Sequence, residues 1–253
     1  MPVSVPRIRH VDSRMIISFI MRERDPVRGA SSVLDLETLI EEFIRTRLRS
    51  FEADTAPDRK TVDAVANKDL ERTAREEQVR AWLGYYKVIL FFPPDRSRTI
   101  AHEIIEFADE LRPASLDQLH AKIIREYNRL RARIQPLAPL APRSKRQREA
   151  ISLTSKALWL CYPNDVPIFD DYALRAIQVI SRICRICPMP GQGLYESFVD
   201  VWLQIYDRIR PVIEKSDLHG YQYQMRVLDG FLWHLGKPDF EVAAASPAMA
   251  STE

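Results

Sequence analysis

The chain has 253 residues, of which 46% are hydrophobic and 28% are charged, so it can bury a core without disulfide or metal cross-links. The 37 Lys and Arg residues nearly balance the 35 Asp and Glu residues, which excludes a uniformly basic nucleic-acid-binding domain. Only 7 glycines accompany 17 prolines, which leaves few positions for tight β-hairpins and favours an all-helical fold.

The first half of the chain predicts amphipathic helices from the spacing of its apolar residues. In VLDLETLIEEFIRTRLRSF, leucine, isoleucine and phenylalanine recur on one helical face opposite glutamate and arginine. The following polar, proline-containing stretch, FEADTAPDRKTVDAVANKD, predicts a loop or short irregular link. FPPDR ends a later helix, and Ser115 is a candidate N-cap. The helices predicted in this half span residues 33–51, 68–92, 99–111 and 116–134.

The composition changes at QPLAPLAPRSKRQRE, where prolines give way to a run of cations. We take this change as the boundary between an N-terminal helical portion, residues 1–140, and a C-terminal helical portion, residues 141–240, with a cleft between the two. An aperiodic tail, residues 241–253, is expected to be disordered. The helices predicted in the second portion span residues 145–161, 170–187, 194–215 and 219–235.

Three cysteines cannot form a complete disulfide framework, and the first residues, MPVSVPRIRH, lack the apolar region of a signal peptide. RMIISFIMR, the most apolar segment, is too short to cross a bilayer and has arginine near both ends. We therefore expect a cytoplasmic protein that does not enter membranes.

The stretch AISLTSKALWLCYPNDVPIFDDYALRAI, residues 150–177, combines a lysine and an aspartate with apolar neighbours. Lys156 stands where the most apolar part of a helix begins, and Asp170 stands at the start of the next helix. Loss of hydration lowers the pKa of a lysine toward the range where the amine is a nucleophile. A carboxylate at a helix N-terminus accepts backbone N–H bonds and stays ionised. The pair would suit covalent amine catalysis.

This order of residues resembles the helix-hairpin-helix DNA glycosylase superfamily, and most of all its divergent 8-oxoguanine-glycosylase-like branch. The resemblance rests on SK, an apolar helix and PIFD, and it covers residues 143–187. It implies an all-α fold with a hairpin element, Lys156 as the Schiff-base nucleophile and Asp170 as the catalytic aspartate, with Asp171 as an alternative. The implied reaction flips a modified nucleotide out of DNA, displaces its base and cleaves the strand through an imine. No cofactor and no metal are implied.

Other residues of the stretch are candidates for DNA contacts. Ser152 and Thr154 occupy the positions where the family's hairpin has glycines, and their hydroxyls could replace backbone N–H donors to a phosphate. The preceding cations could bind phosphates on either side of the flipped nucleotide, or simply form a solvated helix start. Three aromatic residues could stack on the base, or belong to the core. The cations are Arg143, Lys145, Arg146 and Arg148, and the aromatic residues are Trp159, Phe169 and Tyr172.

Two other functions fit the sequence. Because the hairpin glycines are missing, the chain could be a catalytically inactive module that binds nucleic acid or a partner protein. It could also be a helical scaffold with no nucleic-acid role, in which Lys156 extends along the surface and Asp170 only caps a helix. The sequence leaves open which base would be excised and which oligomeric state is formed.

Overall fold

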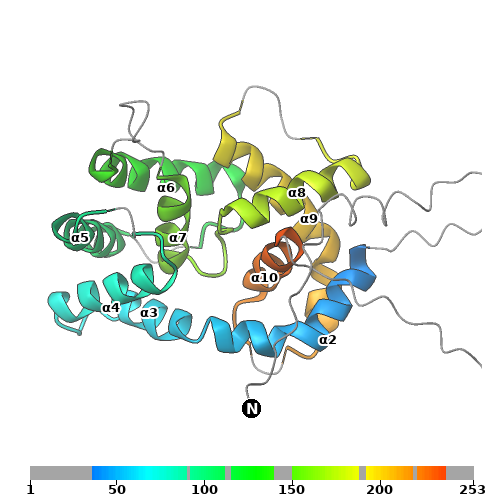
Figure 1. Ribbon diagram of the computed structural model, residues 1–253, viewed down its shortest axis with the longest axis horizontal. Coiled ribbons are helices and arrows are strands. Elements are labelled where there is room, and N and C mark those ends of the chain that lie inside the picture. The colour runs from blue at the N-terminus through cyan, green and yellow to red at the C-terminus, as the bar shows by residue number, and fades with distance from the viewer. Residues whose placement is uncertain are drawn as a thin grey trace, which may run out of the picture.

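A computed structural model describes residues 36–89, 92–111, 115–139, 150–187, 192–218 and 221–237. Within these ranges every regular element is a helix and there is no strand, so the predicted all-α fold is confirmed (Figure 1). The elements are α2 (Leu36–Asp54), α3 (Pro57–Ala66), α4 (Arg72–Tyr85), α5 (Pro94–Glu110), α6 (His120–Ile134), the 3-10 helix η1 (Gln135–Leu137), α7 (Ile151–Cys161), α8 (Asp171–Cys184), α9 (Leu194–Lys215) and α10 (Gln224–Gly236).

Helix α10 packs against α2, α8 and α9, while α7 packs against α3, α5 and α6 (Figure 1). One continuous hydrophobic core joins these groups of helices. Near its middle, the indoles of Trp82 on α4 and Trp159 on α7 stack with centroids 6.1 Å apart. Helix α2, from the first half of the chain, packs on α9 and α10 from the second half. Helix α7, from the second half, packs on α3 and α5 from the first.

Helix α3 lies in the stretch predicted to be a loop, and that prediction is wrong. Pro57 occupies the first turn of α3, where the missing N–H group would have no partner in the helix. Thr61, Ala64 and Val65 then fall at helical spacing and are buried. A helix of only 10 residues with two apolar buried side chains carries a weak periodic signal, and packing on α4 and α7 stabilises it.

Helix α6 begins at His120, four residues later than predicted. Asp117 and Gln118 have φ angles of 52° and 53°, which a helix cannot accommodate. Ser115 does not cap α6. Its hydroxyl donates to the Asp165 carboxylate at 3.1 Å, in the segment that leads to the candidate site.

Two predicted segments, the apolar RMIISFIMR and the tail of residues 241–253, lie outside the described residues, as does the basic run of residues 143–148. Among the helices that are described, none combines the length and the apolar character needed to cross a membrane.

Gly236, at the end of α10, meets the backbone of Tyr172 at the start of α8, and an added Cβ would overlap the Tyr172 carbonyl oxygen. We expect Gly236→Ala to lower the free energy of unfolding by about 1–3 kcal/mol, because backbone cannot move aside as a side chain can. Gly84 in α4 is the matched control, since nothing lies within 4 Å of the added Cβ. Gly84→Ala should be neutral or stabilising by about 1 kcal/mol. Urea denaturation measures the free energy of unfolding of both variants. Equal changes in the two would contradict the close approach of Gly236 to the Tyr172 backbone.

Candidate active site

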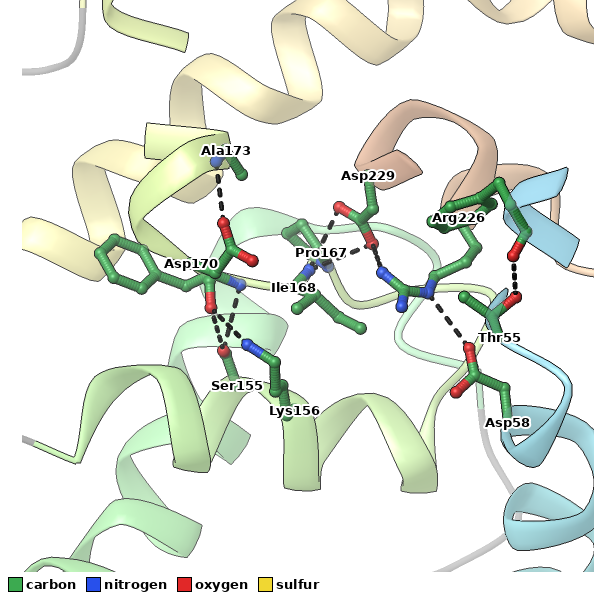
Figure 2. Close-up of polar contacts among 12 residues, drawn as sticks. Thr55, Asp58, Ser155, Lys156, Pro167, Ile168, Asp170, Ala173, Arg226 and Asp229 are labelled. Carbon is green, nitrogen blue, oxygen red and sulfur yellow. Dashed lines mark hydrogen bonds and ion pairs between the residues drawn. The ribbon is translucent and has the colours of Figure 1, made fainter. Parts of the chain in front are cut away.

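Lys156 lies in the middle of α7 and is only 6% exposed. The helix begins at Ile151, and its residues are buried almost all round because α7 runs between α3 and α6. The Lys156 Nζ donates to Ser152 Oγ at 2.8 Å, one turn earlier on α7, and to the Phe169 carbonyl oxygen at 3.3 Å. Figure 2 shows the amine directed at the backbone just before Asp170.

Asp170 is the N-cap of α8, as predicted. Its Oδ1 accepts hydrogen bonds from the backbone N–H groups of Tyr172 and Ala173, both at 2.9 Å. Figure 2 shows the bond from Ala173. These bonds satisfy donors that have no partner within the helix, and they fix the carboxylate beside the amine. The two described side chains share no direct hydrogen bond, so the Lys156 amine is not held in an ion pair with Asp170.

The segment between Lys156 and Asp170 is held by hydrogen bonds to side chains of α7, α9 and α10. Ser155 Oγ on α7 accepts from the Phe169 N–H at 3.1 Å, and Tyr195 on α9 donates its hydroxyl to the Pro167 carbonyl at 3.2 Å. Asp229 on α10 accepts from the Ile168 N–H at 3.3 Å. The backbone that carries the Phe169 carbonyl and Asp170 is therefore fixed relative to Lys156.

A cavity of about 890 Å³ opens at Lys156. This volume is in the range of sites for small organic ligands. Its walls bring together cations, carboxylates and aromatic rings from five helices and the segments beside them. The cations are Lys87, Lys156, Arg175 and Arg226, the carboxylates are Asp170, Asp171 and Asp229, and the rings are Phe51, Tyr85, Tyr86, Phe92, Tyr172 and Trp233.

A buried charge cluster that the sequence did not predict lies on one side of this cavity. Arg226 on α10 faces Asp58 on α3 through Nε at 3.4 Å and Asp229 through Nη1 at 3.8 Å (Figure 2). Trp82 and Tyr86 donate to Asp58 at 2.8 and 2.7 Å. The only sequence signal was an arginine and an aspartate three residues apart in the apolar helix RVLDGFLWHLG.

The cavity wall shifts two pKa values in opposite directions. Burial lowers the pKa of Lys156 to about 8; the nearby Asp170 carboxylate opposes this shift, and the charge of Arg226 adds to it. Burial raises the pKa of Asp229 to about 7, and Arg226 opposes that shift. About a tenth of Lys156 is therefore a neutral amine at pH 7, far more than for a lysine of ordinary pKa, and the neutral form is the one that acts as a nucleophile.

Burial disfavours the charged form of Lys156, so this lysine should destabilise the folded state. The folded-state pKa of Lys156 lies below the unfolded value of 10.5, so unfolding takes up a proton between pH 8 and 10.5. We expect Lys156→Met to raise the free energy of unfolding by about 1–3 kcal/mol at pH 7. The gain should shrink as the pH rises from 8 to 10.5. Denaturant titrations at pH 7 and 10 measure this, and a gain independent of pH would contradict it.

The structure brings some of the predicted site residues to the cavity and places others elsewhere. Ser152, Asp171 and Tyr172 line the cavity together with Lys156 and Asp170. Arg143, Lys145, Arg146 and Arg148 lie outside the described residues.

Three of the predicted contact residues, Thr154, Trp159 and Phe169, are not part of the cavity lining. Thr154 is fully buried inside α7, so its hydroxyl cannot reach a phosphate, and Ser152 is a helical residue rather than part of a turn. Trp159 and Phe169 do not line the cavity. Trp159 stacks on Trp82, and Phe169 packs edge-on against Phe198 with centroids 5.1 Å apart. Both rings are large and apolar, and the core buries them more completely than a cavity wall would.

No family model, no curated protein and no solved structure matches this chain.

Proposed function

We propose that this protein is a DNA glycosylase with lyase activity that excises a modified base through Lys156. The observation that carries the proposal is the buried Lys156 amine, with its pKa lowered to about 8, opening on a cavity beside the Asp170 N-cap. The resemblance of SK and PIFD to the helix-hairpin-helix glycosylases supports the choice of DNA as the substrate.

In this reaction the Lys156 amine attacks C1′ of the flipped nucleotide, and the glycosidic bond electrons leave with the base. Asp170 Oδ1 is engaged in capping α8, while Oδ2 has no contact in the cap, so one oxygen is left to stabilise positive charge at C1′. The Lys156–C1′ adduct then opens to an imine, and loss of a proton from C2′ expels the 3′ phosphate. Borohydride reduces the imine and fixes the DNA to the protein.

The aromatic rings of the cavity fit an extruded base, which stacks on planar side chains. Tyr172 and Trp233 lie with their centroids 6.4 Å apart on the wall near Asp170. Arg175 lies over the Tyr172 ring, 5.6 Å from its centroid, and is exposed, so it is placed to meet a phosphate at the mouth.

One observation favours the second candidate, a module that binds nucleic acid or a partner protein without catalysis. Thr154 is fully buried, and Ser152 lies within α7 rather than in a turn and contacts the Lys156 amine, so neither is placed like the phosphate-binding donors of a glycine hairpin. Contacts to phosphate would then depend on cationic side chains rather than on these two hydroxyls.

The test is borohydride trapping by the full chain against duplexes and single strands. These carry an abasic site or an oxidised, alkylated, deaminated or glycosylated base. A covalent adduct on an abasic site and on one modified base supports the proposal and names the substrate. No adduct on any strand, with DNA binding that weakens as salt rises, would replace it with the non-catalytic module. Neither adduct nor binding would remove DNA from the proposal.

A further inference from the structure

Ser152 is one of two hydrogen-bond acceptors that hold the Lys156 amine. Ser152 Oγ lies 2.8 Å from Nζ, and the second acceptor, the Phe169 carbonyl oxygen, lies 3.3 Å from it. The two come from different parts of the chain, since Ser152 is one turn earlier on α7 and Phe169 immediately precedes the α8 cap. Ser152 and Lys156 both line the cavity.

A neutral primary amine has two N–H groups and one lone pair. When two acceptors take the two N–H groups, the direction of the lone pair is fixed. The Phe169 carbonyl cannot do this alone, because either of the two N–H groups can make that bond, which leaves the lone pair with alternative orientations about the Cε–Nζ bond. A second acceptor selects one of these orientations.

We infer that Ser152 is a positioning residue that aims the Lys156 lone pair into the cavity. The inference rests on the proposed nucleophilic role of Lys156, and it extends to any electrophile that enters the cavity. It assigns to Ser152 a role different from phosphate binding, which its sequence position had suggested.

Neighbouring serines provide the comparison. Ser155 lies three residues later on α7 and accepts from the Phe169 N–H at 3.1 Å, so it fixes the connecting segment rather than the amine. The Ser181 hydroxyl on α8 donates to the Gln178 carbonyl of its own helix and does not contact the site. Ser181→Ala is therefore a control for the loss of a serine hydroxyl.

The first experiment requires no DNA. The full chain is reductively methylated with formaldehyde and an amine–borane, and methylation of each lysine is followed by peptide mass spectrometry. Formaldehyde reacts only with neutral amines, so the rate at Lys156 reports its nucleophilicity. We expect Ser152→Ala to slow methylation of Lys156 by about tenfold, the effect of one lost hydrogen bond. Ser152→Thr should restore the rate, and other lysines, together with the Ser181→Ala protein, should be unchanged.

Measuring the methylation rate of Lys156 at pH 7.5 and at pH 9.5 separates an effect on the orientation of the amine from an effect on its protonation. The charged groups that act on Lys156 are Asp170 and Asp171 of α8 and Arg226 and Asp229 of α10, and together with burial they set its pKa at about 8. At pH 9.5, above this pKa, most of the Lys156 amine is neutral, so a rate difference that persists there comes from orientation. An unchanged rate in Ser152→Ala, or a difference present only at pH 7.5, would overturn the inference.

Trapping on abasic-site DNA is then repeated with the same variants. Slower trapping by Ser152→Ala, restored in Ser152→Thr, supports the positioning role in the proposed reaction. If the unmodified protein traps no DNA but Ser152 still controls methylation of Lys156, the proposed function fails and the positioning role stands. If the protein traps DNA and Ser152→Ala traps it equally fast, the proposed function stands and the positioning role of Ser152 fails.

Discussion

Replacing Lys156 with alanine is expected to abolish the borohydride-trapped DNA adduct, with a loss of roughly 10³-fold or more in the trapping rate. The reason is that the amine is the group that bonds to C1′, and Lys156 is the only lysine that lies deep in the described part of the cavity. Lys87, the other lysine on its wall, is exposed and has a positive φ of 56° in the turn after α4. Gel electrophoresis of trapped protein–DNA adducts measures the loss.

Two further variants test whether the loss is specific to Lys156 and whether the charge of Asp170 contributes to base excision. Lys60→Ala removes an exposed lysine of α3 and should trap DNA at the original rate. Asp170→Asn keeps an N-cap acceptor for the Tyr172 and Ala173 N–H groups but removes the charge. We expect base excision by Asp170→Asn to fall by about 10²–10³-fold with little loss of stability. An adduct of normal yield from Lys156→Ala would show that another amine reacts, and it would remove Lys156 from the proposal.

Replacing Arg226 with alanine is expected to lower the free energy of unfolding by about 3–5 kcal/mol, the cost of removing one partner from a buried charge network. Asp58 and Asp229 are each 2% exposed, and Arg226 supplies the charge that faces both of them. The guanidinium also covers the Phe51 and Trp159 rings, at 5.2 and 5.4 Å from their centroids, so packing is lost as well. Denaturant unfolding followed by tryptophan fluorescence measures the change.

The pH dependence of this loss follows from Asp229. Its folded-state pKa, about 7, lies above the unfolded value of 3.8, so its stabilising contribution is present at low pH and is lost as the pH rises through 7. Without Arg226, which opposes the shift, the pKa should rise further. The difference between the original protein and Arg226→Ala should therefore be smaller at pH 5.5 than at pH 8.

Arg175→Ala is the control for Arg226→Ala, because Arg175 lines the same cavity but is exposed and lies over a single ring, that of Tyr172. Its loss should cost no more than about 1 kcal/mol. A similar small cost for Arg226→Ala, or a loss that grows as the pH falls, would show that Asp58 and Asp229 do not depend on the guanidinium.

The prediction of an N-cap at Asp170 was confirmed because the signal is local. An aspartate that precedes an amphipathic run needs only the next three residues to make its hydrogen bonds. Position along the chain does not give the direction of a side chain, so the sequence did not show that Thr154 is buried, and it left open whether Trp159 and Phe169 face a cavity or the core. Helix α7 is buried on nearly all sides, so its polar residues do not mark an exposed face.

The sequence by itself determined the all-α class, most helix positions and the presence of Lys156 and Asp170 at two adjacent helix segments, since these depend on periodicity and on caps. Only the tertiary structure decided that Arg226 and Asp229 on α10 and Asp58 on α3 meet beside the cavity that Lys156 lines, and that the Phe169 carbonyl accepts from the Lys156 amine. Contacts between Asp58 and Arg226, 168 residues apart, depend on how the helices pack around one core, and no local pattern encodes them.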